Sequence, residues 1–421
     1  MRALGSLVLI VLILGIRGNT KAQTFSPYSA LGIGDIYSRS MVQHQAMGGI
    51  GLSNSSYFFQ NTLNPALIAD NGVYSFTTGF SGESKQIWQL EDREIAKGAN
   101  LGYINMIWPL KQGKVAASFG MMPYSRVNYN FKSTIPVNGN PDAAVTVFNK
   151  GEGGFNQFIF SAGAKLTKSL YFGGNVAYIF SSIFKENNVV LTDPFGPYVP
   201  TTRARLTAGD FVYGLGMAYK QVLNEDFRVN IGGVYNFQKD LSVTKFQTLI
   251  SNTTTNTPIK VDTLVDNVDG YIYLPASYGV GISFEKLNKW MFGVDINIQD
   301  WDKYLDFDGE NTELVSSLKV GIGGEFTPNI SSVDNYFSRI TYRFGFNFEK
   351  TPYYLRDTQI DELGMNIGFS LPVANFSTVD FGIRYGSRGT IDNNLIRENF
   401  VRVYFGVTFN DQRWFVRPKF N

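Results

Sequence analysis

Few side chains in this sequence could carry out catalysis, and His44 is the only histidine. A serine hydrolase needs a histidine beside an activated serine and an orienting acid. Ser38 and Ser40 are near His44 in sequence, but nothing marks either serine as activated. The chain also shows no phosphate-binding loop, zinc-ligand spacing or nucleotide-binding fingerprint. We therefore expect His44 to be a structural hydrogen-bonding residue, and the chain to be neither an enzyme nor a cofactor-binding protein.

An acidic stretch contains the remaining candidate ligands. Carboxylate oxygens are the ligands that calcium prefers, so this stretch could hold the ion, although a solvated loop is the favoured interpretation. We assign no metal site. The chain has no cysteine, which excludes disulfides and a lipoprotein anchor. The acidic residues are Asp300, Asp302, Asp306, Asp308 and Glu310.

The N-terminus carries an export signal. An apolar run from Leu4 to Ile16 is followed by polar residues that end in Thr20-Lys21-Ala22. Small residues at these positions suit signal peptidase, so residues 1–22 are predicted to be a signal peptide and the mature chain to begin at Gln23. An uncleaved anchor is the alternative, but the run is shorter than the roughly 18 to 20 apolar residues of a spanning helix.

The composition favours a membrane β-barrel. Aromatic residues make up 15% of the chain and charged residues 17%, whereas soluble domains carry about 25% charged residues. Glycine occurs 43 times. Because basic and acidic residues nearly balance, the sequence offers no basic surface for nucleic acid. A large soluble β-sandwich array could share this composition, so the periodicity of the strands must decide between the two classes.

Apolar and polar residues alternate along many segments, which predicts strands with one apolar face. Near the C-terminus, Val403, Phe405 and Val407 alternate with Tyr404 and Gly406. Such strands fit an exterior that faces lipid and an interior that is polar. We expect the interior charges to pair inside the barrel and to hold an N-terminal plug. These charges are Asp295, Lys319, Glu325, Arg343, Asp380, Arg384 and Arg402.

The pattern predicts an all-β fold, a transmembrane antiparallel β-barrel of about 14 strands over residues 71–412. Tight connections alternate with connections of up to about twenty residues, as in outer-membrane barrels with short periplasmic turns and long external loops. We therefore expect an outer-membrane protein of a Gram-negative-type envelope, with both termini in the periplasm and a short C-terminal tail over 413–421. The predicted strands are 72–82, 99–109, 113–131, 152–167, 170–186, 205–221, 226–245, 268–286, 289–301, 314–327, 338–350, 361–372, 377–387 and 399–411.

Residues 23–70 precede the first strand and read neither as a strand nor as a long amphipathic helix. Their clustered glycines allow close backbone packing. A free periplasmic tail is the alternative, but the segment is too apolar to be left in water. We expect a plug folded inside the barrel, with apolar residues available to bind a ligand. These residues are Phe25, Leu31, Met47, Phe58 and Phe59.

The mature chain resembles the FadL family of outer-membrane transporters for long-chain fatty acids and other hydrophobic compounds. The resemblance rests on Gln45-Ala46-Met47-Gly48-Gly49-Ile50-Gly51, on Asn64-Pro65-Ala66 just before the first strand, and on the even pattern of strands. It implies an N-terminal hatch inside a fourteen-stranded barrel, with ligand captured from outside and released sideways through a break in the third strand. The plug motif comprises Gly48, Gly49, Gly51, Asn64, Pro65 and Ala66.

The third predicted strand contains a candidate for that break. Proline cannot donate a ladder hydrogen bond, so Pro123 belongs at an edge or a bulge. Together with Gly120 it is the candidate lateral portal. The alternative is a strand that has already left the membrane at this point.

The leading hypothesis is passive uptake of hydrophobic small molecules, captured at the plug and released laterally through the third strand. The alternative is a non-transporting FadL-like barrel that acts as a structural or accessory subunit of an envelope protein-secretion or assembly complex. Function does not follow from the barrel alone. Expected partners are outer-membrane lipid and a hydrophobic ligand, with other envelope proteins as the partners under the alternative.

Overall fold

A computed structural model describes residues 25–90, 92–137, 140–191, 198–253, 257–311, 313–373 and 376–411. The predicted signal peptide and C-terminal tail lie outside these ranges. In the described part, no helix is long and apolar enough to span a membrane. The strands of the wall are β2 Tyr74–Gln89, β3 Asp92–Lys111, β4 Val115–Pro123, β5 Ser125–Val137, β6 Asn140–Lys165, β7 Leu170–Leu191, β8 Tyr198–Val222, β9 Phe227–Asn236, β10 Lys239–Thr253, β11 Pro258–Leu274, β12 Ser277–Lys286, β13 Trp290–Gln299, β14 Ser317–Phe326, β15 Thr341–Leu355, β16 Thr358–Pro372, β17 Thr378–Arg388 and β18 Arg397–Asp411.

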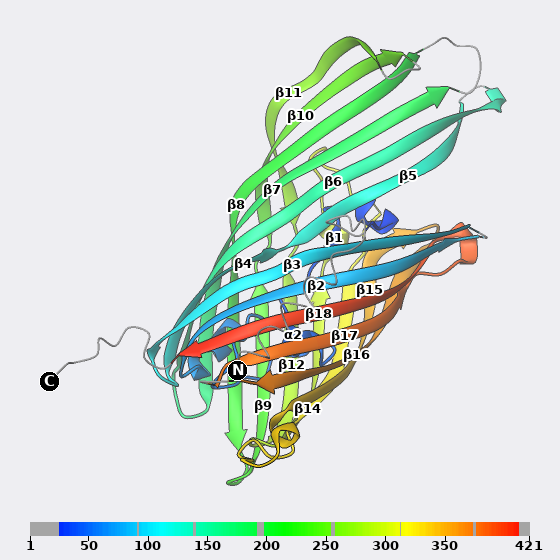
Figure 1. The fold of residues 1–421 in the computed structure, drawn as a ribbon. Coiled ribbons are helices and arrows are strands. Elements are labelled where there is room, and N and C mark those ends of the chain that lie inside the picture. Colours follow the sequence, from blue (N-terminus) through cyan, green and yellow to red (C-terminus); the bar gives the residue numbers. More distant parts are fainter. Residues whose placement is uncertain are drawn as a thin grey trace.

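The wall is a closed antiparallel barrel of 14 strands, as the sequence predicts. The last strand, β18, pairs with the first, β2, from Arg397↔Trp88 to Asp411↔Tyr74 and so closes the cylinder. Three of the barrel strands are interrupted, and their halves carry separate labels: β4 with β5, β9 with β10, and β11 with β12. Figure 1 shows the resulting tilted cylinder.

Side chains of the wall alternate between the exterior and the interior. In β16, Leu363, Met365 and Ile367 are about half exposed, whereas Glu362 and Asn366 are buried. This alternation places apolar side chains outside and polar ones in the lumen, which is the arrangement of a membrane barrel. The sequence-based assignment of interior charges is confirmed on this point.

Several strands continue well beyond the barrel as one sheet, which we call the upper sheet. It comprises β5, β10 and β11 with residues 140–152 of β6, 183–191 of β7 and 198–208 of β8. It projects at the top of Figure 1. The predicted twenty-residue connections over 185–204 and 246–267 are therefore wrong, because most of each is strand. The outward positions of these extensions carry charged residues such as Lys150, Glu186 and Arg203, so the apolar outward face that marks a lipid-facing strand is lost there.

The plug lies inside the barrel (Figure 1, dark blue) and has little regular structure. Its elements are η1 (Pro27–Ala30), β1 (Asp35–Ile36), α2 (Val42–Gln45) and η2 (Pro65–Asp70). η1 contacts β5, α2 contacts β16 to β18, and η2 contacts β4 and β6 to β8. Three further short helices, η3 (Trp301–Lys303), η4 (Tyr336–Arg339) and η6 (Asp392–Asn394), lie between strands.

Candidate functional site

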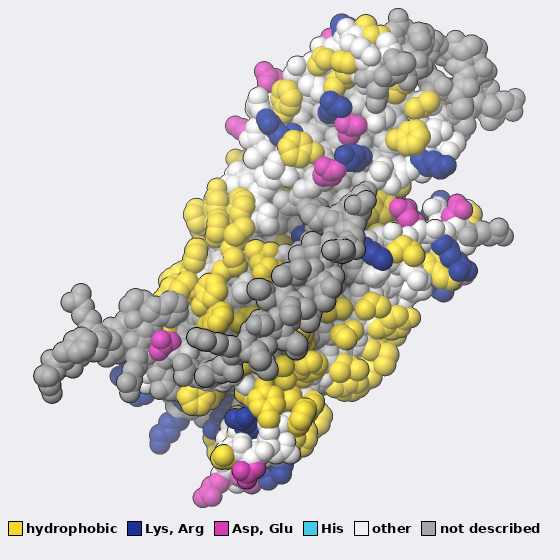
Figure 2. Space-filling view, viewed as in Figure 1, with side chains coloured by type: hydrophobic (Ala, Val, Ile, Leu, Met, Phe, Trp, Pro, Cys, Tyr) yellow, Lys and Arg dark blue, Asp and Glu magenta, His cyan; other side chains and the backbone are white. Residues whose placement is uncertain are grey.

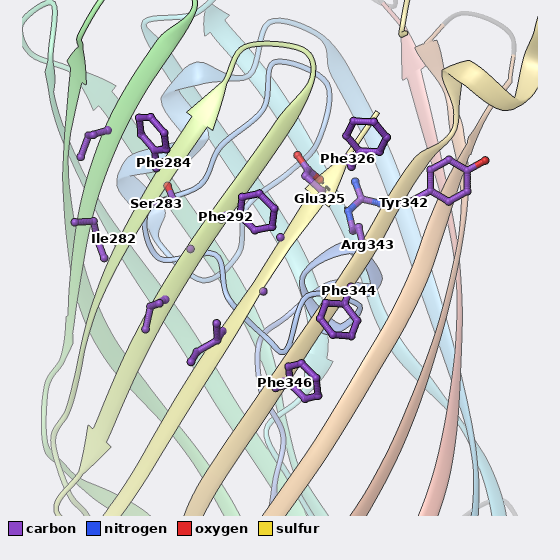
Figure 3. A pocket seen from close by; sticks show the side chains of 16 residues that line it. Ile282, Ser283, Phe284, Phe292, Glu325, Phe326, Tyr342, Arg343, Phe344 and Phe346 are labelled. Carbon is purple, nitrogen blue, oxygen red and sulfur yellow. Dashed lines mark hydrogen bonds and ion pairs between the residues drawn. The ribbon is translucent and has the colours of Figure 1, made fainter. Parts of the chain in front are cut away.

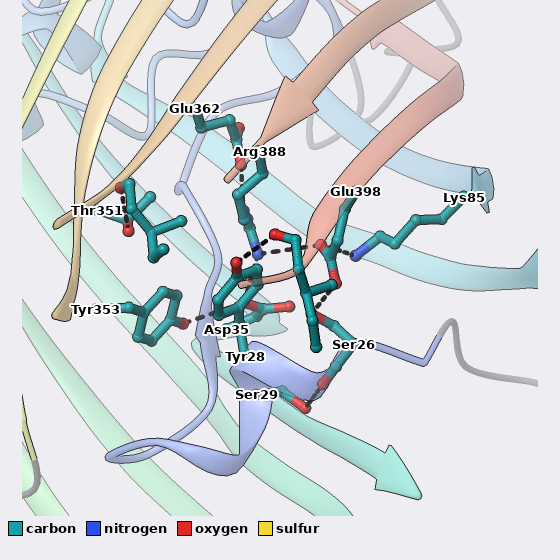
Figure 4. Close-up of polar contacts among 12 residues, drawn as sticks. Ser26, Tyr28, Ser29, Asp35, Lys85, Thr351, Tyr353, Glu362, Arg388 and Glu398 are labelled. Atoms are coloured by element: carbon teal, nitrogen blue, oxygen red, sulfur yellow. Dashed lines mark hydrogen bonds and ion pairs between the residues drawn. The ribbon is translucent and has the colours of Figure 1, made fainter. Parts of the chain in front are cut away.

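A buried cluster of charges joins the plug to the wall, and we call it the plug–wall cluster (Figure 4). Arg388 lies at its centre. Its Nη1 is 2.8 Å from Oδ1 of Asp35 in the plug, and its Nε is 2.6 Å from Oε2 of Glu362 on β16. Lys85 of β2 pairs with Glu398 of β18 at 2.9 Å, and the side chains of both are almost completely buried. Charged groups from four wall strands, β2, β16, β17 and β18, therefore gather in one cluster, and Arg388 links this cluster to Asp35 of the plug.

Neutral residues of the plug and of the wall strand β15 complete this cluster. The hydroxyl of Ser26 donates to Oε1 of Glu398 at 2.6 Å, and the hydroxyl of Tyr353 donates to Oδ1 of Asp35 at 3.0 Å. The hydroxyl of Tyr28 donates to the carbonyl of Ile396. A buried charge is tolerated when it is both paired and hydrogen-bonded. The first residues of the plug therefore contribute to the electrostatic balance of the lumen.

The other interior charges are paired in the same way. Arg402 pairs with Glu83 at 2.8 Å, and Arg343 pairs with Glu325 at 2.9 Å. The carboxylate of Asp380 accepts from Nε2 of Gln43 in the plug at 2.7 Å. These contacts place the predicted lumenal charges in ion pairs or against the plug, as their sequence pattern indicates. Arg384 also pairs with Glu362, and Lys319 with Glu349.

Glycines of the wall receive the glycine-rich part of the plug. A Cβ atom built on Gly345 would lie 2.2 Å from the carbonyl carbon of Met47, and one on Gly323 would lie 2.4 Å from the Met47 oxygen. From the other side, Gly48 has a φ of +74°, and its Cβ would meet the Phe346 oxygen at 2.5 Å. Plug backbone and wall backbone are thus in direct contact, which only glycine permits.

Asp295 fixes the next turn of the plug. Its Oδ2 accepts from the amide of Gly51 at 2.6 Å and from the amide of Leu52 at 2.8 Å. Gly49 has a φ of +83°, and a Cβ on Gly51 would collide with the ring of His44. His44 itself is buried within the plug, in keeping with a structural role.

The Asn-Pro-Ala triplet caps η2 and docks on three further wall glycines. Oδ1 of Asn64 accepts from the amide of Ala66 at 3.0 Å, while Nδ2 donates to the carbonyls of Leu52 and Met217 at 2.8 and 3.1 Å. Asn64 is completely buried. Pro65 closely contacts the wall at Gly163, Gly173 and Gly216.

The wall opens where β4 gives way to β5. The ladder between β3 and β4 ends at Ile104↔Met121, whereas β4 remains paired with β6 on its other side up to Pro123↔Asn156. Among the described residues, residues 92–102 of β3 have no ladder with β5, and we call the boundary between these two segments the seam. Figure 1 shows β3 and β5 diverging from this point. Gly120 lies below the seam, opposite Asn105 of β3.

The plug occupies the lower part of the seam. Strand β1 pairs with β5 at Asp35↔Arg126 and Ile36↔Ser125. The amide of Tyr37 donates to the carbonyl of Tyr124 at 2.9 Å. Backbone of the plug therefore covers the open edge of β5 at its first residues, Ser125 and Arg126. The cavity of about 100 Å³ that remains here is lined by charged groups, among them Glu83, Lys85, Arg126, Arg388 and Arg402.

The five apolar plug residues proposed as ligand contacts do not surround one cavity. Phe25 and Leu31 pack against a core cluster that also contains Tyr28 of η1. Met47 is buried elsewhere in the plug, against Ile50 and Met291. Phe58 stacks on Phe376 with ring centroids 4.8 Å apart, and Phe59 lies 5.7 Å from the guanidinium of Arg343. None of the five lines the 100 Å³ cavity at the seam or the larger apolar hollow over β12 to β15.

A much larger apolar hollow, of about 660 Å³, lies on the lipid-facing side of the wall over β12 to β15, and we call it the outer groove. Its floor includes Gly324, the outward-facing position between Phe292 of β13 and Phe344 of β15. Figure 3 shows these phenylalanines with Phe326 and Phe346 around it. The loop over 327–340, directly below, exposes Val333 at 89% and Phe337 at 71%.

The carboxylates of the acidic stretch make contacts with nearby groups of the protein. Among the described residues no group of three or more potential ligands comes together. Oδ1 of Asp306 accepts from the amides of Asp308 and Glu310, and Asp308 pairs with Lys245. The carboxylates are thus used within the loop and by the upper sheet.

Sequence reasoning missed the members of the plug–wall cluster. Position 362 could have been placed in the lumen, because it precedes the outward-facing Leu363 in an alternating strand. The partners Asp35, Glu398 and Lys85 are far apart in sequence and lie where the alternation is weak. Pairing among them had no local signal.

Comparison with known proteins supports the architecture. A family model described as BamG matches residues 4–421. No curated protein matches the chain in sequence. Solved structures with a similar fold include "CymD monoaromatic hydrocarbon channel" (14% identity, 91% of this chain and 100% of that one, TM-score 0.59), the Ralstonia pickettii toluene transporter TbuX (16%, 87% and 97%, 0.56) and a Pseudomonas aeruginosa FadL homologue (11%, 89% and 98%, 0.60).

At these identities the likeness shows the fold alone. The resemblance to the FadL family therefore holds for the architecture of an outer-membrane barrel, whereas the matching family model carries a different name.

Proposed function

The chain belongs to the BamG family, and on that premise we propose that it serves a neighbouring envelope protein as a structural or accessory subunit. This is the alternative from the sequence, and the observation that carries it is the plug–wall cluster. Asp35, Arg388 and Glu398 tie the plug, near the N-terminus, to β17 and β18 at the other end of the chain. A barrel whose plug is held by buried ion pairs suits a rigid structural element better than a conduit.

The chemistry of the lumen supports the same proposal. An apolar molecule that moved from the lumen towards the seam would meet Glu83, Arg126 and Arg402. Breaking a buried ion pair costs about 3–5 kcal/mol, because the remaining charge stays uncompensated. An apolar ligand supplies no group to replace the lost partner. Passage by this route would thus be opposed at each step.

The outer surface offers a docking site for a partner. The outer groove is lined by Phe326 and Tyr342, which flank the 327–340 loop, and that loop exposes Val333 and Phe337. Exposed apolar patches mark sites of protein or membrane contact. We place the short turns and this loop in the periplasm, so a partner would contact the barrel from the membrane and the periplasm together.

The test is purification of the full-length protein from membranes in a mild amphiphile. The proposal expects a stoichiometric protein partner that is lost when Val333 and Phe337 are both changed to serine. Leu223→Ser is the matched control, since Leu223 is 56% exposed in another short turn. A homogeneous protein without a partner, or equal loss in the control, would contradict the proposal.

A second candidate is the uptake of hydrophobic molecules with lateral release at the seam. It is favoured by the lack of pairing between β3 and β5, in the fold shared with transport channels. A disulfide that joins β1 to β5 would keep the plug in the seam. If uptake is the function, cells carrying this locked protein take up labelled fatty acid as slowly as cells that lack it. If the accessory role is correct, the locked protein replaces the native one fully.

A further inference from the structure

The outward face of β6, β7, β8 and β10 changes character along its length. On β7, the outward residues from Leu170 to Phe180 are mostly apolar over about ten residues, the length that crosses a membrane as a strand. Near its upper limit Phe180 lies 5.1 Å from Phe158, and Tyr178 lies 5.0 Å from Phe211. Aromatic side chains gather at the boundary between hydrocarbon and headgroups. The membrane boundary on this face thus lies close to Phe180.

Charged residues begin two outward positions above that boundary, in two adjacent rows across the sheet. One row joins Glu152, Phe184, Arg205 and Phe246, and the other joins Lys150, Glu186, Arg203 and Thr248. Phe184 is four residues beyond Phe180, or about 13 Å along the strand. Figure 2 shows the basic and acidic side chains gathered on the upper part of the molecule, above the apolar surface.

These two rows surround a hollow of about 390 Å³ on the outer face. Nε of Arg203 is 2.7 Å from Oε2 of Glu186, and Nζ of Lys150 is 2.7 Å from Oε1 of Glu152. No carboxylate among the described residues pairs with Arg205, whose guanidinium lies 5.6 Å from the centre of the Phe246 ring. With three cations and two carboxylates on this face, the hollow carries one unbalanced positive charge.

We propose that this hollow binds the phosphate-bearing headgroup of a glycolipid in the outer leaflet. The site lies just above the hydrocarbon, where the headgroup of a lipid with its chains against Phe180 and Phe211 must be. Arginine binds phosphate with several parallel hydrogen bonds, and Arg205 is free to do so. The flat Phe184 and Phe246 rings beside it provide surfaces on which a sugar ring can pack.

The existing ion pairs do not oppose such binding. The Arg203–Glu186 and Lys150–Glu152 pairs are largely exposed, and exposed pairs contribute little to stability. A phosphate can therefore take over Arg203 or Lys150 at small cost. The proposal depends on the outward orientation of the upper sheet but not on the accessory role of the barrel.

The test uses the full-length protein, purified in detergent and then incubated with a diphosphorylated lipid A. Wild-type protein is expected to retain the glycolipid, measured as bound phosphate after delipidating washes. Changing both Arg203 and Arg205 to glutamine should weaken retention at least tenfold. Arg93→Gln is the matched control, because Arg93 also stacks on an aromatic ring, with its guanidinium 3.9 Å from Trp88, but lies on another strand.

Two further arms separate the sources of phosphate with wild-type protein alone, so a variant that fails to fold cannot obscure the result. Dephosphorylated lipid A should bind at least tenfold more weakly, and neither inorganic phosphate nor phosphatidylglycerol should displace the bound glycolipid at equal concentration. Equal binding of the dephosphorylated lipid, full displacement by phosphatidylglycerol, or an equal loss in Arg93→Gln would each overturn the proposal.

Discussion

Single glycines of the wall determine where the plug can lie. Gly345 is in direct contact with the backbone between Met47 and Gly48, so an added methyl group has no flexible neighbour to displace. We expect Gly345→Ala to destabilise the folded protein by about 1–3 kcal/mol, the usual effect of overpacking. The measurement is the temperature at which the barrel loses its compact form on semi-native electrophoresis.

The control for this prediction is Gly82→Ala. A Cβ atom on Gly82 meets nothing closer than 4.0 Å, and its backbone is not left-handed. This variant should unfold at the same temperature as wild type. Equal behaviour of the two variants would show that the glycine contacts do not hold the plug.

Arg388 is the second residue whose replacement should weaken the attachment of the plug to the wall. Glutamine at this position removes the cation from Asp35 and Glu362, and a buried charge that loses its partner costs about 3–5 kcal/mol. We expect Arg388→Gln to loosen the plug and to make the barrel leaky to small ions, measured as conductance in planar bilayers. Lys260→Gln removes only the exposed pair with Asp262 and should leave conductance unchanged, since such pairs are worth about 0–1 kcal/mol.

For single residues, the sequence predicted which side chains point into the lumen but not which residues they contact there. Alternation was sufficient to place Arg343, Asp380 and Arg402 in the lumen. It could not predict that Ser26 bonds Glu398, because those residues are 372 positions apart and nothing local links them. Contacts between the plug and the wall depend on closure of the barrel, which a single strand does not encode.

The strand β1 is the element that covers the seam, and its register can be tested directly. The native chain has no cysteine, and Ile36 lies opposite Ser125 in the antiparallel pair. Opposed residues in such a pair are close enough for a disulfide. We expect the Ile36→Cys, Ser125→Cys double variant to oxidise quantitatively, measured by mass spectrometry after alkylation.

The matching control pairs Ile36→Cys with Gly98→Cys on the other side of the seam. Gly98 lies in the part of β3 that has no ladder with the plug. This variant should keep two free thiols. A cross-link in both variants would mean that β1 moves freely across the seam.

At the scale of elements, the sequence predicted the number of barrel strands but not their length. Ends near the membrane, such as Leu170 and Arg388, lie within two residues of the prediction. The upper sheet was missed because its outward positions above the lipid are polar or charged, while its apolar residues, such as Ile183 and Val243, are buried on the inward face. Residues 198–204 of β8, for instance, include a proline, two threonines and an arginine, and only pairing with β7 and β10 shows that they are strand.

For the whole molecule, the lipid-facing surface governs behaviour in solution. Outward residues such as Ile367 at 63%, Phe292 at 62% and Leu363 at 57% are exposed all around the wall. We expect the protein to remain monodisperse in detergent and to aggregate when the detergent is removed, measured by light scattering. A stable monomer in plain buffer would mean that the apolar face is covered by something other than lipid.

The residues of the plug leave the ribosome before any strand of the wall exists. The partners of Ser26 and Asp35 lie on or next to β16, β17 and β18, more than three hundred residues later in the chain, so both residues can take their positions only after these strands have formed. The N-terminal plug must therefore stay unfolded during export and insertion. It must enter the barrel when β18 pairs with β2. Contacts of such long range make folding slow. Docking of the N-terminal plug should therefore be the last step in the maturation of this protein.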